Sequence, residues 1–200
     1  LTLQGNDLDD SEIAELLTAA QFKFHTLGLD SLPLKEKALI AISNLNTSEL
    51  KELSLAGSPF GDRVVAMNRT MHFPNLTSLI LVPTLLNSAG TRIGETGFRY
   101  IVENWKADNI TSLQLQDCHI NDVTLQLLAQ WDLPKLKQLN ISFSMDTLTG
   151  TGFSAFKVDQ FENLEKLALS NPTVYADGNL ITLEGAQALS KLRFPRLKHL

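Results

Sequence analysis

The chain has 200 residues, of which 44 % are hydrophobic and 20 % are charged, as is usual for a folded domain. Its net charge of −5 argues against nucleic-acid binding, which usually needs a concentrated basic face, and no apolar run is long enough to span a membrane as a helix. Cys118 is the only cysteine, which excludes an intramolecular disulfide and favours a reducing compartment such as the cytoplasm.

One spacing of apolar residues recurs from the N-terminus onward, and its alternating positions predict short strands. Its most regular copy is Ile110, Leu113, Leu115, Cys118 and Ile120. In chain order, the other copies are Leu1, Leu3, Asn6 and Leu8; Phe24, Leu27, Leu29, Leu32 and Leu34; Leu50, Leu53, Leu55, Ser58 and Phe60; Leu76, Leu79, Leu81, Thr84 and Leu86; Leu136, Leu139, Ile141 and Ser144; Leu164, Leu167, Leu169, Pro172 and Val174; and Leu197 and Leu200. So many copies in one register are not a product of chance.

Between these strands the apolar spacing changes to that of a helix. The predicted helical stripes are Ile13, Leu16, Leu17 and Ala20; Leu39, Ile42 and Leu45; Val64, Met67 and Met71; Phe98, Ile101, Val102 and Trp105; Val123, Leu127, Leu128 and Trp131; Phe153 and Phe156; and Ala186, Leu189 and Leu192. Asp10, Ser11 and Glu12 predict the start of the first helix, and Asn121 with Asp122 predicts the start of the fifth. Alternating strands and helices predict an α/β fold.

This pattern resembles the leucine-rich repeat family, and within it the ribonuclease-inhibitor-like class. The basic period of 26 residues with room for a helix, and the glycines at the helix starts before Phe153 and Ala186, carry the resemblance. The consensus Asn or Cys is found only at Asn6 and Cys118, while small hydroxyl residues occupy most of the other copies. The resemblance implies one domain over residues 1–200, a solenoid or horseshoe of about seven repeats with parallel strands on the concave face and helices on the convex face. We expect it to be part of a longer chain.

If the leucines point into the core, the residues beside them face solvent. Ala56, Ile80 and Val82 then form a small apolar patch on adjacent strands, with Gln114 and Gln116 beside it. Apolar groups rimmed by polar ones are typical of protein-binding sites. The alternative is that the long segment after Val82 folds back over the patch. Including the next strand, the candidate partner-binding residues are Ala56, Ile80, Val82, Gln114, Gln116, Asn140 and Ser142.

Three repeats are longer than the basic period, and their extra residues fall near 87–94, 145–150 and 175–179. Such loops border the concave face and could rim a binding site, or they could be neutral variation of surface loops. Lys191, Arg193, Arg196 and Lys198 cluster near the C-terminal end, which indicates a solvated face.

Residues that could carry chemistry are sparse. Cys118 next to His119 lacks the ligand spacing of a zinc site, and position 118 is the repeat's structural Cys. The glycine-rich stretch 90–97 has no phosphate-binding spacing and is read as a loop that leads into a helix. Trp105 and Trp131 end helical stripes and are expected in the core. No catalytic residue, metal ligand, cofactor or small-molecule substrate is predicted.

The sequence therefore predicts a non-enzymatic protein–protein interaction module that binds another protein on its concave face and strand-to-helix loops. Two alternatives remain. One is the substrate-recruiting part of a larger enzyme, such as a ubiquitin ligase or a bacterial effector, and the other is a structural spacer. Five Asn-x-Ser/Thr triplets, at Asn46, Asn68, Asn75, Asn109 and Asn140, keep a glycosylated extracellular protein open as an alternative to a cytoplasmic one.

Overall fold

The computed structural model describes residues 1–20, 23–82, 93–116, 118, 120–142, 148–170 and 181–200. Within them, one sheet has the strand order β1-β2-β4-β6-β7-β8, and each strand is parallel to its neighbour. Its strands are β1 (Thr26–Gly28), β2 (Glu52–Ser54), β4 (Ser78–Ile80), β6 (Ser112–Gln114), β7 (Gln138–Asn140) and β8 (Lys166–Ala168). The predicted mixed α/β fold with parallel strands is confirmed.

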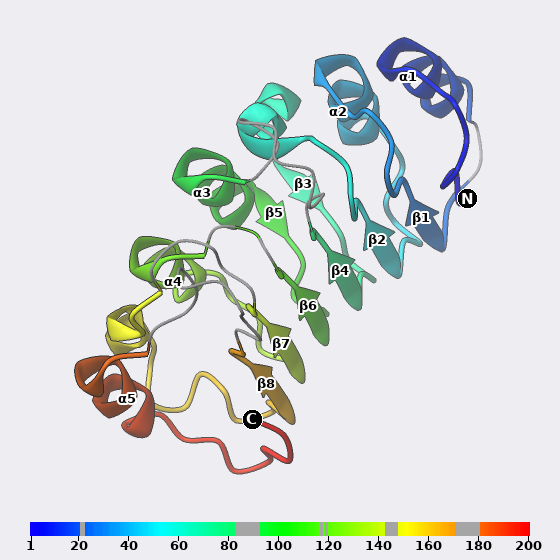
Figure 1. The fold of residues 1–200 in the computed structure, drawn as a ribbon. Helices are drawn as coiled ribbons and strands as arrows, with labels where there is room; N and C mark the ends of the chain where they lie inside the picture. Colours follow the sequence, from blue (N-terminus) through cyan, green and yellow to red (C-terminus); the bar gives the residue numbers. More distant parts are fainter. Residues whose placement is uncertain (21–22, 83–92, 117, 119, 143–147, 171–180) are drawn as a thin grey trace.

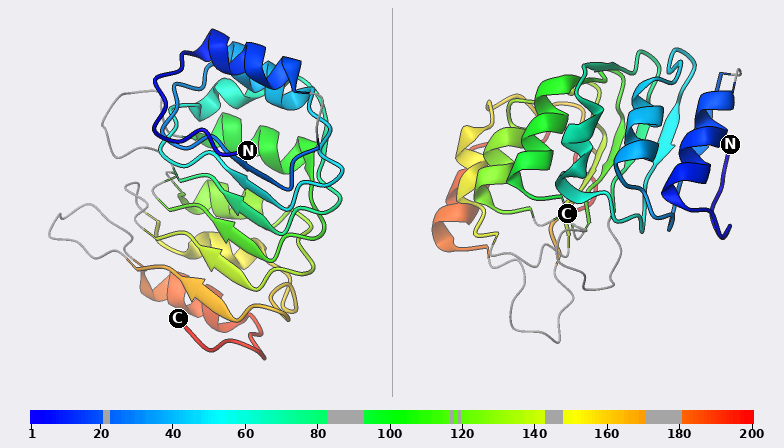
Figure 2. Two further views of the ribbon diagram at one scale, coloured as in Figure 1. Left: turned by 90° about the vertical axis from the view of Figure 1, so that its right-hand side faces the viewer. Right: turned by 90° about the horizontal axis from the view of Figure 1, so that it is seen from above.

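Helical segments follow the strands in a second layer. They are α1 (Asp10–Ala19), α2 (Glu36–Ser43), η1 (Gly61–Met67), α3 (Glu95–Asn104), α4 (Asp122–Leu128), η2 (Thr151–Ala155) and α5 (Leu183–Ser190), of which η1 and η2 are 3₁₀ helices. Figure 1 shows the helices on the outer side of a shallow curve and the sheet on its inner side, with the two termini at opposite ends. The further views in Figure 2 show the same stepwise succession from the N-terminal to the C-terminal end. A strand and the helix that follows it are called a unit below.

The strands are in register, so equivalent leucines form a continuous ladder against the helices. This leucine ladder consists of Leu27, Leu53, Leu79, Leu113, Leu139 and Leu167, which are paired across the strands and at most 1 % exposed. Thr2 pairs with Gly28 at one end of the sheet, and His199 pairs with Lys166 at the other. The predicted copies around Leu1 and Leu197 therefore continue the same register. No single unit closes its own core, since each buries its leucines against its neighbours.

The third helical stripe departs from the prediction at Met71. Helix η1 ends at Met67 because Asn68 adopts a left-handed conformation, with φ 45°. Met71 instead belongs to β3 (Met71–His72), which pairs in parallel with β5 (Trp105–Lys106). Trp105 is therefore in a strand directly after α3, although it is buried as predicted. Phe156 likewise follows η2 in an extended conformation.

The first helix begins at Asp10, within the predicted start, but its N-cap is the residue before it. Asp9 is its N-cap, and it forms a reciprocal capping box with Glu12. Asp10 is free for another role, and its carboxylate accepts hydrogen bonds from the Lys35 N–H at 2.7 Å and the Ala38 N–H at 3.1 Å, at the start of α2. The predicted start at Asn121 is confirmed, since the Asn121 side chain caps α4.

The same kind of bond joins two more pairs of units. Asp62 in η1 accepts hydrogen bonds from the Gly94 and Gly97 N–H groups at the start of α3, both at 2.8 Å. Asp122 in α4 accepts from the Thr149 N–H at 3.0 Å and the Gly152 N–H at 2.8 Å, at the start of η2. These acidic side chains satisfy N–H groups that a helix start leaves without partners. They therefore link successive helices along the layer.

Glycine at two helix starts has a steric reason. A Cβ at Gly152 would lie 2.5 Å from the Asp122 carbonyl oxygen, and a Cβ at Gly185 would lie 1.9 Å from the Thr149 carbonyl oxygen. Both distances are well inside van der Waals contact. The successive helical segments can therefore approach this closely only where the side chain is a hydrogen atom.

Small polar side chains link the units behind the strands. The fully buried Ser58 hydroxyl donates to the Leu29 carbonyl at 2.6 Å and accepts from the Leu32 N–H at 3.1 Å. The Cys118 thiol donates to the Leu81 carbonyl at 3.0 Å. Each bond reaches the preceding unit, so these side chains satisfy backbone groups that would otherwise be buried without a partner.

Candidate functional site

The face of the sheet opposite to the leucine ladder is the candidate site, and we call it the open face. The strand register arranges its residues in rows that cross the sheet. One predicted row is Gly28, Ser54, Ile80, Gln114, Asn140 and Ala168, and the next is Asp30, Ala56, Val82, Gln116, Ser142 and Ser170. A third row was missed, namely Thr26, Glu52, Ser78, Ser112, Gln138 and Lys166. Period-two alternation from the leucine ladder was the signal that could have found it.

The predicted apolar patch of Ala56, Ile80 and Val82 is brought together by the register. Ile80 of β4 pairs with Ser54 on one side and Gln114 on the other. Ala56 and Val82 lie at the same level of adjacent strands, because the Gly57 N–H donates to the Val82 carbonyl at 2.7 Å. All three side chains are half-buried, so each still presents part of its surface to solvent.

An acidic side chain fixes one border of the apolar patch. The Asp30 carboxylate accepts hydrogen bonds from the Ser54 hydroxyl and, at 2.9 Å, from the Ala56 N–H. Ser54 was expected to face solvent, but it is only 5 % exposed. The patch therefore has a rigid, polar border on its N-terminal side.

Gln114 and Gln116 border the apolar patch on its other side, as predicted. The Gln114 amide nitrogen donates to the Ser112 hydroxyl at 3.0 Å. The Gln116 side-chain oxygen is buried and has no hydrogen-bond partner among the residues that the structure describes. An unsatisfied buried acceptor costs about 1–3 kcal/mol. A hydrogen bond donated to this oxygen would therefore stabilise the structure.

Ser142 is a correction to the predicted set. It is 2 % exposed and offers no surface to a partner. Its surroundings come from two units, because the Ser142 N–H donates to the Asn140 side-chain oxygen at 3.0 Å and the Ser142 hydroxyl lies 3.4 Å from the Ser170 hydroxyl of the next unit. Asn140 is half-buried and uses its oxygen in this contact, so only part of its amide remains for another group.

Charged pairs lie at the N-terminal ends of the strands. Lys23 is 2.8 Å from Glu49, and Lys198 is 2.7 Å from Glu165. The hydrogen bond and the charge of Lys23 lower the pKa of Glu49, and those of Lys198 lower the pKa of Glu165. These carboxylates therefore remain ionised at neutral pH, but they are exposed and do not resemble catalytic acids or bases.

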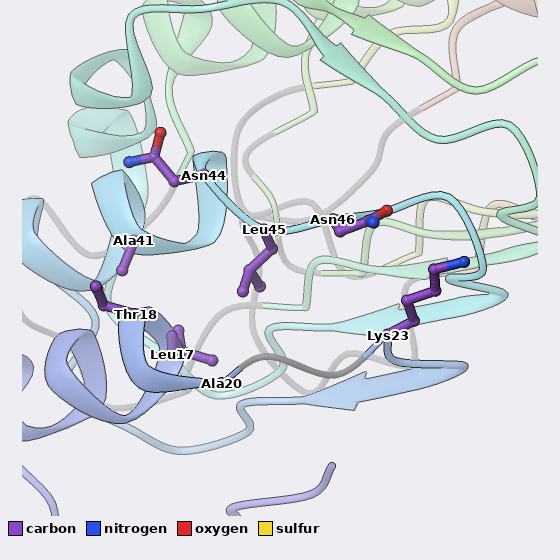
Figure 3. Close-up of a pocket in the computed structure, with 8 residues that line it drawn as sticks. All are labelled: Leu17, Thr18, Ala20, Lys23, Ala41, Asn44, Leu45 and Asn46. Carbon is purple, nitrogen blue, oxygen red and sulfur yellow. The ribbon is translucent and has the colours of Figure 1, made fainter.

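One hollow opens beside the ends of α1 and α2, away from the open face. Its lining is Leu17, Thr18, Ala20, Lys23, Ala41, Asn44, Leu45 and Asn46. Figure 3 shows these side chains around the hollow, with Lys23 as the only charged one. A similar hollow lies beside α4 and η2, lined by Trp131 and Val158 among others. Both are gaps between successive helical segments, and among the described residues that line them there is no pairing of a nucleophile with a base.

The described residues contain neither a metal-binding cluster nor a membrane-spanning helix. No group of three or more His, Cys, Asp or Glu side chains there could hold a metal ion. Cys118 is fully buried in its link to Leu81, and His119 lies outside the described residues. No helix in this part of the chain is both long and apolar enough to cross a membrane.

The loops predicted to rim the site fall mostly outside the described residues. Of 87–94, only 93 and 94 are described, and of 145–150 only 148 to 150. Residues 175–179 lie outside entirely. The prediction of a loop rim therefore stays a prediction.

No protein-family model matches this chain, and no curated protein is significantly similar to it in sequence.

Proposed function

We propose that this chain is a leucine-rich repeat module of the ribonuclease-inhibitor-like class, a horseshoe-shaped solenoid with the sheet on its concave side. Three features support the proposal. Six strands share one register, the leucine ladder is buried throughout, and Ser58 and Cys118 make equivalent bonds to the preceding unit. Parallel strands lie about 4.8 Å apart while packed helices need about 8–10 Å, so such a stack curves with its sheet inside.

We further propose that the module is not an enzyme and that its open face binds a partner protein. The observation that carries this is the apolar patch of Ala56, Ile80 and Val82. It lies between the Asp30 border and the glutamine pair, and its side chains remain partly exposed although the leucines beside them are fully buried. An apolar centre within a polar rim is the arrangement of a binding hot spot. We include no cofactor or small-molecule substrate in this proposal. Because Cys118 is the only cysteine of the chain and cannot form an intramolecular disulfide, we also propose a reducing compartment such as the cytoplasm.

The test introduces charge into the patch. Proteins captured by the unaltered chain from cells of its own source would be identified by mass spectrometry, and each would then be purified. The variant with Ile80→Asp and Val82→Asp should bind the true partner at least about tenfold more weakly, because an unpaired carboxylate would be buried in the interface. The variant with Ile40→Asp and Val65→Asp is the matched control, since both are exposed apolar residues of the helical layer, on α2 and η1.

Thermal unfolding must first show that both variants are folded. Selective loss of binding in the Ile80→Asp and Val82→Asp variant would support the proposal. Equal affinities of all three proteins for every captured partner would contradict it.

A further inference from the structure

Positive charge is concentrated at one end of the sheet, although the whole chain has 22 acidic and 17 basic residues. The concentration lies where the last strands begin, in residues 135–138, 163–166 and 196–199. These twelve positions contain Lys135, Lys137, Lys166, Arg196 and Lys198, which we call the basic edge, and a single carboxylate, Glu165. The equivalent residues 23–26, 49–52, 75–78 and 109–112 contain two cations, Lys23 and Lys51, and two carboxylates, Glu49 and Glu52.

Strand pairing places the members of the basic edge side by side. The Lys137 carbonyl accepts hydrogen bonds from the Glu165 and Lys166 N–H groups, at 2.7 and 2.9 Å. The Glu165 carbonyl in turn accepts from the Lys198 N–H at 2.9 Å. Lys137, Glu165 and Lys198 therefore occupy one level of three successive strands. The basic edge therefore differs from the cluster predicted from the sequence, which included Arg193. Arg193 pairs with Asp159 and is not part of the edge.

Most of this positive charge is not neutralised. All five cations are exposed. Lys198 pairs with Glu165, and Lys135 donates to the Asn109 side-chain oxygen. Lys137, Lys166 and Arg196 form no ion pair or side-chain hydrogen bond within the described part of the chain. Lys137 and Arg196 nevertheless lie near enough to Glu165 to help lower its pKa, so several cations surround one carboxylate.

From this charge complementarity we infer that the basic edge binds an acidic segment of a partner protein, on a surface separate from the apolar patch. The edge spans three strands, about 10 Å, which suits a few carboxylates better than the 6–10 phosphate contacts of a typical nucleic-acid site. The chain's net charge of −5 also repels a long polyanion, whereas a short acidic segment can contact the edge alone. Specificity and fast association are the expected gains from such complementarity.

The experiment uses a fluorescently labelled peptide of alternating Glu and Ser, and a control peptide with Gln in place of Glu. Fluorescence anisotropy at low and at physiological ionic strength would give the affinities. The unaltered chain should bind the Glu peptide and not the Gln peptide, and more weakly as salt rises. The variant with Lys137→Glu and Lys166→Glu should lose at least about tenfold in affinity.

The matched control is the variant with Lys35→Glu and Lys51→Glu, which has the same change of net charge at exposed positions near the other end of the sheet. Its affinity at physiological salt should stay within about twofold, because charges farther apart than the Debye length are screened. Three outcomes would overturn the inference: equal losses in both variants, no preference for the Glu peptide, or tighter binding of a single-stranded oligonucleotide of equal charge. All three outcomes concern the basic edge alone, so they leave the proposed partner site at the apolar patch untouched.

Discussion

The two faces of the sheet differ in how much their chemistry varies from strand to strand. The leucine ladder has the same residue at all six positions. The open face changes from Asp30 and Ser54, through the apolar Ile80 and Val82, to Lys166 at the far end. The inward face must be uniform because each leucine packs against its counterparts in neighbouring units. The outward face has no such constraint, so its differences are where partner recognition can be encoded.

The largest difference in stability between the two faces is expected for two adjacent substitutions in β6. Leu113 is fully buried and Gln114 is half-exposed. Leu113→Ala should lower the free energy of unfolding by about 2–5 kcal/mol, because it removes buried methyl groups and leaves a cavity. Gln114→Ala should change it by no more than about 0.5 kcal/mol. Urea unfolding followed by circular dichroism would measure both, and similar losses would show that the two faces are not energetically distinct.

A smaller effect is expected from the polar links behind the ladder. Ser58→Ala removes the hydroxyl that bonds both the Leu29 carbonyl and the Leu32 N–H, and both groups would remain buried. The free energy of unfolding should fall by about 1–3 kcal/mol. Ser78→Ala is the control on the open face, where Ser78 is half-exposed, and it should be close to neutral. A neutral Ser58→Ala variant would mean that water or a shift of the backbone satisfies these groups.

The spacing of the leucines was sufficient to predict the six strands of the main sheet, because burial and hydrogen bonding repeat with that spacing, but it did not predict the pairing of β3 with β5. The position of every strand in the sheet follows from that spacing, and so do the neighbours in the apolar patch. The core positions of Trp105 and Trp131 followed from their helical stripes, although Trp105 itself lies in a strand. These features are local patterns that recur, and periodicity can detect them.

Side-chain bonds between units could not be predicted in the same way. The capping-box spacing of Asp9 and Glu12 could have identified Asp9 as the cap of its own helix, but nothing in the local sequence shows that Asp10 bonds the next helix. Ser142 is buried, and its hydroxyl lies 3.4 Å from that of Ser170 in the next unit. The basic edge was missed because its members come from three units, and the sequence suggested a different cluster around Arg193. Each of these features depends on distances across units, which a period alone does not give.

The smallest change in stability is expected in the helical layer, because the hydrogen bonds that link its helices are polar and partly exposed. Burial raises the pKa of Asp122, but hydrogen bonds from the Gly152 N–H and from the Thr149 side chain and N–H outweigh it, so the pKa lies below its ordinary value of 3.8. A carboxyl group with a lowered pKa in the folded state stabilises the fold above its unfolded pKa, and this contribution is lost as the pH falls through the folded value. Asp122→Asn should cost about 1 kcal/mol at neutral pH, as expected for a lost cap.

That difference between the parent chain and Asp122→Asn should shrink as the pH falls below the ordinary pKa of 3.8, and it should disappear once the pH is below the lowered pKa of Asp122 in the folded chain. Asp108→Asn is the control, since Asp108 is exposed and accepts no hydrogen bond within the described residues. Thermal unfolding of the three proteins between neutral and acidic pH would measure the effect. A stability difference at Asp122 that does not depend on pH would show that the geometry of the link matters rather than its charge. No stability difference between Asp122→Asn and the parent chain at any pH would instead mean that neutral acceptors can replace these acidic residues, and the helical layer would then tolerate the same variety as the open face.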